Sequence, residues 1–131
     1  GNNHDASVSQ TGTGGTSNIN QYGGDSNTAF LVQTGSSTSN INQNGSSNEA
    51  SVNQNGAGNL STVNQTGNGN GVGDVNNGTG SWGPTANNIT GVTQLGADNM
   101  SSVNQTANNA RATVGQTGNE NDSYVTQTIN A

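Results

Sequence analysis

The sequence contains no cysteine, no lysine, and only one arginine and one proline. Without cysteine, neither a disulfide framework nor a thiolate metal ligand or nucleophile is available. A single basic residue, Arg111, and a net charge of −6 cannot neutralise a run of phosphates, which argues against nucleic-acid binding. No apolar run approaches the roughly 20 residues that a membrane-spanning helix needs, so we expect no transmembrane segment.

Apolar and aromatic residues are also scarce, at 24% and 3% of the chain. What fills the sequence instead is 26 Asn, 10 Gln, 15 Ser, 17 Thr and 21 Gly, together 89 of 131 residues. This composition suits both disordered polar segments and polar repeats that stack as β-structure. The chain opens with GNNHDASVSQ, which has no charged-then-apolar leader, so we expect any export signal to have been removed or never present.

Glutamine decides between disorder and repetition, because it recurs at a nearly constant spacing. All gaps between successive glutamines are 10 to 12 residues, except one of 29. The glutamines are Gln10, Gln21, Gln33, Gln43, Gln54, Gln65, Gln94, Gln105, Gln116 and Gln127. Disorder requires no such spacing, so the sequence favours a repeat of about 11 residues.

Other residue types keep fixed places relative to glutamine. Branched aliphatic residues stand two positions before it: Val8, Ile19, Leu31, Ile41, Val52, Val63, Val92, Val103, Val114 and Val125. Glycine usually stands two positions after it, at Gly12, Gly23, Gly35, Gly45, Gly56, Gly67, Gly96 and Gly118. A small residue stands four before it, and asparagine often stands six before it, at Asn27, Asn48, Asn59, Asn88, Asn99 and Asn121.

The unit therefore reads N-x-(A/S)-x-(V/I)-x-Q-x-G. Its regular positions fall on every second residue, which predicts a β-strand with one face turned inward. The glycine supplies a residue that is free to adopt positive φ where the chain turns. We expect the inward Gln, Asn and aliphatic positions to form ladders that carry self-assembly, and the glycines to form the turns.

Successive units alternate between two classes, so the full period is about 22 residues. Inside the long gap, the segment from Asn68 to Asp74 fits the second class, with Val72 in the aliphatic position and Asp74 in place of glutamine. An irregular insertion within residues 75–86 follows, around Trp82. This alignment predicts eleven strands, six in one half of the stack and five in the other.

Two short strands and two turns per period describe one coil of a flattened, two-sheet β-solenoid of the cross-β type. Coils stacked at about 4.8 Å would give five to six coils rising about 25 Å. We expect residues 1–131 to form this single all-β domain. Its two open strand edges lack the lysines or covering cap that soluble proteins use, and stacking another copy of the chain would satisfy them.

The pattern S-x5-Q-x-G-x-x-N-x-A-x3-Q, seen best from Ser37 to Gln54, resembles the curlin repeat of curli, the amyloid fibres of bacterial biofilms. The resemblance covers about Asn3 to Gln127 and is closer to the major, fibre-forming subunit than to the minor nucleating one. Asp74, Ala110 and the Trp82 insertion depart from the pattern. The resemblance implies a secreted, extracellular homopolymer serving adhesion and biofilm structure, with a nucleator subunit and an outer-membrane secretion channel as partners.

Other functions find less support in the residues. His4 and Asp5 have no second histidine, cysteine or nearby base, and the acidic residues do not follow a calcium-binding repeat. We therefore predict no catalytic, cofactor-binding or metal-binding residues and no enzymatic activity. The alternatives are a minor nucleating curli subunit, a soluble β-solenoid of the ice-binding kind, or a disordered surface tail. The residues that precede glutamine form no threonine ladder, which weighs against the ice-binding alternative.

Overall fold

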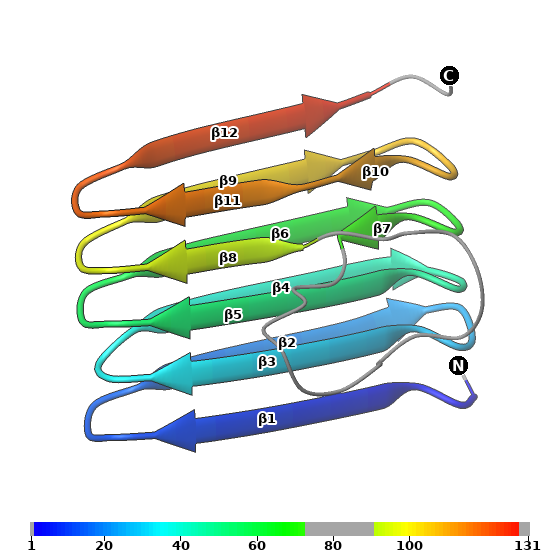
Figure 1. Ribbon diagram of the computed structural model, residues 1–131. Coiled ribbons are helices and arrows are strands. Elements are labelled where there is room, and N and C mark those ends of the chain that lie inside the picture. Colours follow the sequence, from blue (N-terminus) through cyan, green and yellow to red (C-terminus); the bar gives the residue numbers. More distant parts are fainter. Residues whose placement is uncertain (1, 73–90, 129–131) are drawn as a thin grey trace.

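The computed structural model describes residues 2–72 and 91–128, and strands are the only regular elements in these ranges. They form two parallel sheets that face each other (Figure 1). The first sheet contains β1 (Asp5–Thr11), β3 (Thr28–Thr34), β5 (Glu49–Asn55), β7 (Gly71–Val72), β8 (Val92–Leu95), β10 (Arg111–Ala112) and β11 (Val114–Thr117). The second contains β2 (Thr16–Gly23), β4 (Thr38–Gly45), β6 (Leu60–Thr66), β9 (Met100–Gln105) and β12 (Asp122–Gln127).

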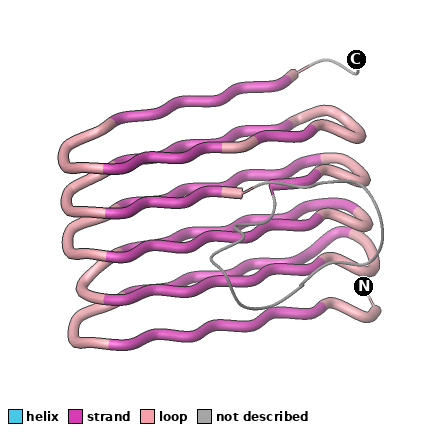
Figure 2. Tube along the Cα trace, viewed as in Figure 1, coloured by secondary structure: helices cyan, strands magenta, loops and turns pink. Residues whose placement is uncertain are grey.

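Consecutive strands alternate between the two sheets, except that β7 and β8, and β10 and β11, follow each other within the first sheet. Turns on the two sides of the stack join strands of different sheets (Figure 2). Each strand therefore pairs with the strand one full coil away, in parallel and in register. In the second sheet, Ile19 lies beside Ile41 and Gln21 beside Gln43, 22 residues further along the chain. The predicted all-β solenoid with a coil of about 22 residues is confirmed, and it has about five coils.

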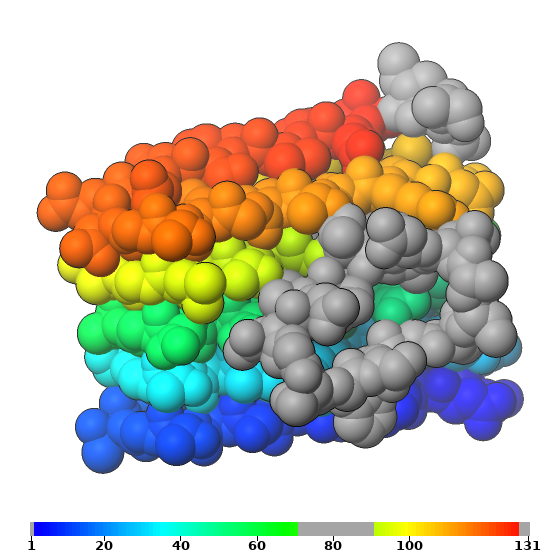
Figure 3. All heavy atoms as spheres, in the orientation of Figure 1, coloured from blue at the N-terminus to red at the C-terminus, as the bar shows by residue number. Residues whose placement is uncertain are grey.

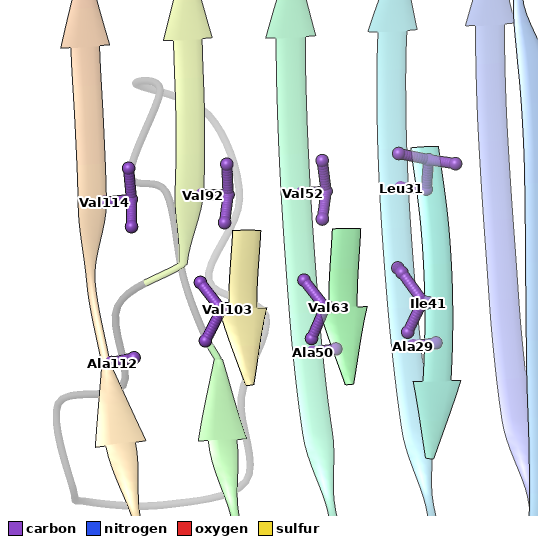
Figure 4. Close-up of a cluster of buried hydrophobic side chains, with 10 residues drawn as sticks. All are labelled: Ala29, Leu31, Ile41, Ala50, Val52, Val63, Val92, Val103, Ala112 and Val114. Atoms are coloured by element: carbon purple, nitrogen blue, oxygen red, sulfur yellow. The ribbon is translucent and has the colours of Figure 1, made fainter. Parts of the chain in front are cut away.

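The inward face of each strand follows the predicted two-residue alternation. Along β5, Ala50, Val52 and Gln54 are buried, whereas Glu49, Ser51 and Asn53 are partly exposed. The aliphatic side chains of both sheets meet between the sheets and form one continuous core (Figure 4). The buried members of this core are Ala29, Leu31, Ile41, Ala50, Val52, Val63, Val92, Val103, Ala112 and Val114.

The turns depend on backbone conformations that glycine adopts without strain. All eight predicted turn glycines have positive φ, for example 98° at Gly35 and 129° at Gly56. Glycine is also required by space, because a Cβ atom on Gly56 would collide with the carbonyl oxygen of Gly96 in the next coil. The turns are thus packed directly on one another along the stack.

One strand position in the first sheet is shared by two short strands, and this corrects the predicted alignment. Strand β7 pairs with the start of β5, placing Gly71 beside Glu49 and Val72 beside Ala50. Strand β8 then pairs with the rest of β5, placing Val92 beside Val52. Strands β7 and β8 together therefore complete one unit of the first sheet.

The prediction that Val72 belongs to a complete strand of its own, separate from that of Val92, is therefore wrong. The backbone of Val72 pairs at the small-residue position of Ala50, not in the predicted aliphatic column, because Val92 occupies that column. Asp74, Asn88 and the predicted insertion at 75–86 lie outside the described residues.

The count of eleven strand positions changes accordingly. We call each strand position along a sheet a level; β7 and β8 share one level, and β10 and β11 share the next. Both sheets then have five levels within the described residues, so neither half of the stack is longer than the other.

Candidate assembly site: amide ladders and two open ends

Glutamine side chains form a continuous hydrogen-bonded ladder inside the first sheet. Each Nε2 donates to the Oε1 of the glutamine on the next level, and every bond in the ladder points toward the C-terminal end. The bonds run from Gln10 to Gln33 (2.6 Å), Gln33 to Gln54 (2.7 Å), Gln54 to Gln94 (2.8 Å) and Gln94 to Gln116 (2.9 Å). The ladder therefore has a donor end and an acceptor end.

The second sheet repeats this arrangement with the same direction. Its bonds run from Gln21 to Gln43 (2.9 Å), Gln43 to Gln65 (2.8 Å), Gln65 to Gln105 (3.2 Å) and Gln105 to Gln127 (2.8 Å). Nε2 atoms also donate across the interior to the opposite sheet, as from Gln43 to the Thr28 carbonyl (2.9 Å) and from Gln54 to the Thr38 carbonyl (3.1 Å). The glutamines thus join levels within each sheet and join the two sheets to each other.

Asparagines form further ladders where the chain enters each strand. The backbone N–H of Asn48 donates to Oδ1 of Asn27 at 3.0 Å, and the backbone N–H of Asn70 donates to Oδ1 of Asn48 at 3.0 Å. The Asn27 and Asn48 Nδ2 atoms donate to the carbonyls of Gly45 and Gly67, each in the turn one level further on. On the other side, Asn59, Asn99 and Asn121 form the equivalent ladder. These side chains hold neighbouring turns together.

Three members of these asparagine ladders were not predicted. Asn70 is fully buried and stands where Asn88 was expected, because the glutamine of its unit is Gln94. His4 fills the first position, and its Nδ1 accepts from the Asn27 backbone N–H at 3.4 Å. Ser37 is the third of these members, and its Oγ donates a hydrogen bond to the Gly56 carbonyl at 2.9 Å. The positions of His4 and Ser37 relative to the next glutamine, six before, were the available signal.

An outward amide ladder was also missed. On the second sheet, Asn20 Nδ2 donates to Asn42 Oδ1 at 2.9 Å, and Asn42 donates to Asn64 at 2.9 Å. Asn104 continues this column in the β-register. The signal was the repeated asparagine directly before glutamine.

The small-residue column of the second sheet contains hydroxyls without partners. The Oγ atoms of Ser39, Ser61 and Ser101 are buried and have no hydrogen-bond partner among the described residues. Among the described residues, Nε2 of His4 is the other buried side-chain polar atom without a partner. A buried hydroxyl without a partner opposes folding.

The two ends of the stack are incomplete copies of its middle. Space-filling bands run from the N-terminal level at one end to the C-terminal level at the other (Figure 3). Val8 on β1 is 46% exposed, whereas Leu31 and Val52 above it in the same column are fully buried. All of β1 is exposed, and the inward residues of β12 are only partly buried. Each end thus exposes an inward surface that the middle levels bury.

Two absences apply to residues 2–72 and 91–128. No group of three or more acidic or histidine side chains in these ranges is arranged to hold a metal ion. In the same ranges, no helix is long and apolar enough to cross a membrane.

The fold and its interior define a class, the two-sheet parallel β-solenoid whose levels are joined by stacked amides. The family model of the curlin associated repeat matches the chain over residues 37–67 and again over 45–73. Residues 37–73 therefore match the curlin associated repeat, and the predicted resemblance to that family is confirmed there. Comparisons with curated proteins and with solved structures give no match.

Proposed function

We propose that this chain is the structural subunit of an extracellular bacterial amyloid fibre of the curli kind. Subunits stack head to tail, so that β1 and β2 of one copy continue the sheets that end in β10–β11 and β12 of the copy before it. The curlin repeat supports a structural rather than an enzymatic role and a self-assembling cell-surface fibre. We call the contact between two such copies the junction.

The observation that carries this proposal is the complementarity of the two ends. At the N-terminal end, Gln10 and Gln21 begin the two glutamine ladders, and each has an Oε1 that no lower glutamine of the described residues reaches. At the C-terminal end, Gln116 and Gln127 finish the ladders and have no glutamine above them in the described part of the chain. Because all bonds in both ladders point the same way, the donor end of one copy matches the acceptor end of the next.

The equal number of levels in the two sheets supports the same geometry. Five levels in each sheet, counted over the described residues, let a second copy extend both sheets at once without a gap. Stacking would also cover Val8, and burial of apolar surface stabilises such a contact by about 25 cal/mol per Å². The backbone groups along the outer edges of the end strands would gain partners as well, which removes the open edges.

Family resemblance supports the finer assignments. It implies export to the cell surface after removal of a signal peptide, passage through an outer-membrane channel, and templating by a separate nucleator subunit. The fibre would serve adhesion and the biofilm matrix, and the chain would be the major subunit with no catalytic activity and no cofactor.

The proposal is tested at the edge of β12. The backbone N–H of Met100, at the start of β9, donates to the carbonyl of Asn121, and that of Thr106, just after β9, donates to the carbonyl of Gln127. In a parallel pair, the N–H groups of alternate residues in a strand point toward the neighbouring strand and the others point away. Thr126 is in register with Asn104, which lies an even number of residues from Met100 and so donates toward β12 as Met100 does. The N–H of Thr126 itself therefore points away from β9, toward the position of the next copy. Thr126→Pro removes that N–H and places a ring there, while leaving the pairing of β12 with β9 intact.

We expect Thr126→Pro to raise the concentration of unpolymerised protein at equilibrium by roughly tenfold or more, since a lost hydrogen bond leaves a buried acceptor unpaired. Thr126→Ala keeps the N–H and is the matched control, with polymerisation close to that of the unchanged chain. Thioflavin fluorescence and sedimentation measure both. Equal polymerisation of the proline and alanine variants would contradict head-to-tail stacking through β12.

A further inference from the structure

The first sheet contains one outward column of side chains with opposite charges at its two ends. From the N-terminal level onward, the column contains Asp5, Thr28, Glu49, Gly71 and Arg111, each pair fixed by the strand register. Asp5 and Arg111 are both exposed. Arg111 is the only lysine or arginine in the chain, and it lies on the last level of this sheet.

We propose that the junction is selected by an ion pair between Arg111 of one copy and Asp5 of the next. This inference rests on the proposed head-to-tail stacking and adds to it the register and the partner chemistry. If the first sheet continues in register across the junction, the residue that follows Arg111 in the column is Asp5 of the next copy. Neighbouring strands lie about 4.8 Å apart, which places the two side chains within reach of each other.

The register explains why the charges stand at these two positions. Directly below Arg111 lies Gly71, which has no side chain to pair with it, and the nearest carboxylate of its own column is Glu49, two strand spacings away. The copy stacked above would bring Asp5 to a distance of one strand spacing. A reversed copy, placed C-terminal end to C-terminal end, would bring no Asp5 to Arg111. Opposite charges directly across a strand pair stabilise it and like charges destabilise it, so the pair favours one orientation.

Charge reversal with complementation tests the pair. In Arg111→Asp, every junction would set the new aspartate against Asp5. In Asp5→Arg, every junction would set the new arginine against Arg111. We expect each variant alone to leave roughly two- to tenfold more unpolymerised protein at low salt than the unchanged chain. In an equimolar mixture of the two, the variants can alternate along the fibre, so that every junction sets an arginine against an aspartate.

The mixture has a defined expected result. A junction between the aspartate end of Arg111→Asp and the arginine end of Asp5→Arg is attractive, and so is its counterpart between the unchanged Arg111 and the unchanged Asp5. At the same total concentration, the mixture is therefore expected to polymerise nearly as well as the unchanged chain.

Two further variants separate the junction pair from other effects. The doubly reversed chain Asp5→Arg/Arg111→Asp restores an attractive junction and is expected to polymerise alone, which a misfolded chain would not do. Asp122→Arg changes the net charge as Asp5→Arg does, but its column leads to Thr16 of the next copy. Mixing Asp122→Arg with Arg111→Asp is therefore expected to give no rescue. The differences between variants should shrink in about 0.5 M salt, where charges on the surface are screened within a few ångströms.

The outcomes distinguish this inference from the proposed function. Rescue in the mixture of Arg111→Asp and Asp5→Arg, and in the doubly reversed chain, supports the pair. In another outcome, the unchanged chain forms fibres while the mixture polymerises only to the average extent of its two components. That result would overturn the ion pair and leave head-to-tail stacking standing. An effect of Arg111→Asp alone, with none from Asp5→Arg, would assign Arg111 to Glu49 of its own chain and overturn the inference. Failure of the unchanged chain to form fibres would overturn the proposed function itself.

Discussion

The Nδ1 atom of His4 accepts a hydrogen bond from the backbone N–H of Asn27, at 3.4 Å. On later levels the same N–H bond is accepted by an asparagine Oδ1, as when Asn48 donates to Asn27 at 3.0 Å. His4 therefore begins the asparagine ladder of the first sheet. It substitutes an imidazole nitrogen for an amide oxygen at the level that a preceding copy would contact.

We expect His4→Ala to loosen the first coil, because the Asn27 N–H loses its acceptor at a partly buried position. The loss should be about 1 kcal/mol in the free energy of opening at that site. His4→Asn supplies the oxygen used elsewhere in the ladder and should restore or exceed the original protection. Hydrogen exchange of the Asn27 amide measures both variants, and unchanged exchange in His4→Ala would show that the imidazole is not its acceptor.

Gln54 occupies the middle of its ladder and provides the sharpest test of the interior amides. It accepts from Gln33, donates to Gln94 and also reaches the Thr38 carbonyl. Gln54→Ala removes these three hydrogen bonds from the core, and we expect it to lower the free energy of unfolding by about 2–4 kcal/mol. Asn53→Ala alters the adjacent, outward residue of the same strand and should stay within about 0.5 kcal/mol. Denaturant titration compares them; similar losses would contradict the assigned roles of the two faces.

Ser61 offers a change with the opposite sign. Its hydroxyl is buried between those of Ser39 and Ser101, and none of the three has a partner among the residues that the structure describes. Ser61→Ala removes a polar group that is desolvated without compensation, so we expect stability to be unchanged or raised by up to about 1 kcal/mol. The midpoint of denaturant unfolding measures the change. A loss above about 1 kcal/mol would indicate that the hydroxyl is paired in solution.

Gly56 and Gly115 differ in whether the structure leaves room for a side chain. Gly56 has φ of 129°, and a Cβ there would collide with the Gly96 carbonyl, so Gly56→Ala should lower stability by at least about 2 kcal/mol. Gly115 lies in β11 with no atom within 4 Å of a built Cβ, and Gly115→Ala should be neutral or stabilise by up to about 1 kcal/mol. Thermal unfolding of the two variants is the measurement, and equal melting temperatures would refute the close packing of the turns.

Much of this fold could be predicted from the sequence because its rules are local. Glutamine spacing gave the coil length, the two-residue alternation gave the inward face, and glycine two residues after glutamine gave the turns. Gln33, Val52 and Gly45 are all placed as the pattern predicts. Each of these rules depends only on residues within one unit, and each unit repeats the last.

The errors arose where one unit is not contiguous in the sequence. Asn70 and Gln94 belong to the same level, but the intervening chain made Val72 and Asp74 resemble a separate unit. Only the register with β5 shows that one strand is completed by two segments. The role of His4 was missed for another reason, since the pattern assigned the position six before glutamine to asparagine, and at that position an imidazole nitrogen accepts the same backbone N–H.

The central claim is that copies of this chain stack as solenoids, each adding five levels to the fibre. A reflection at 4.7–4.8 Å would accompany any cross-β fibre, so mass per unit length is the more direct measurement. Dark-field electron microscopy of single protofilaments should give one 13.0 kDa subunit per about 24 Å, which is five levels at about 4.8 Å each. One subunit per about 4.8 Å, the value for extended chains stacked singly, would contradict the solenoid.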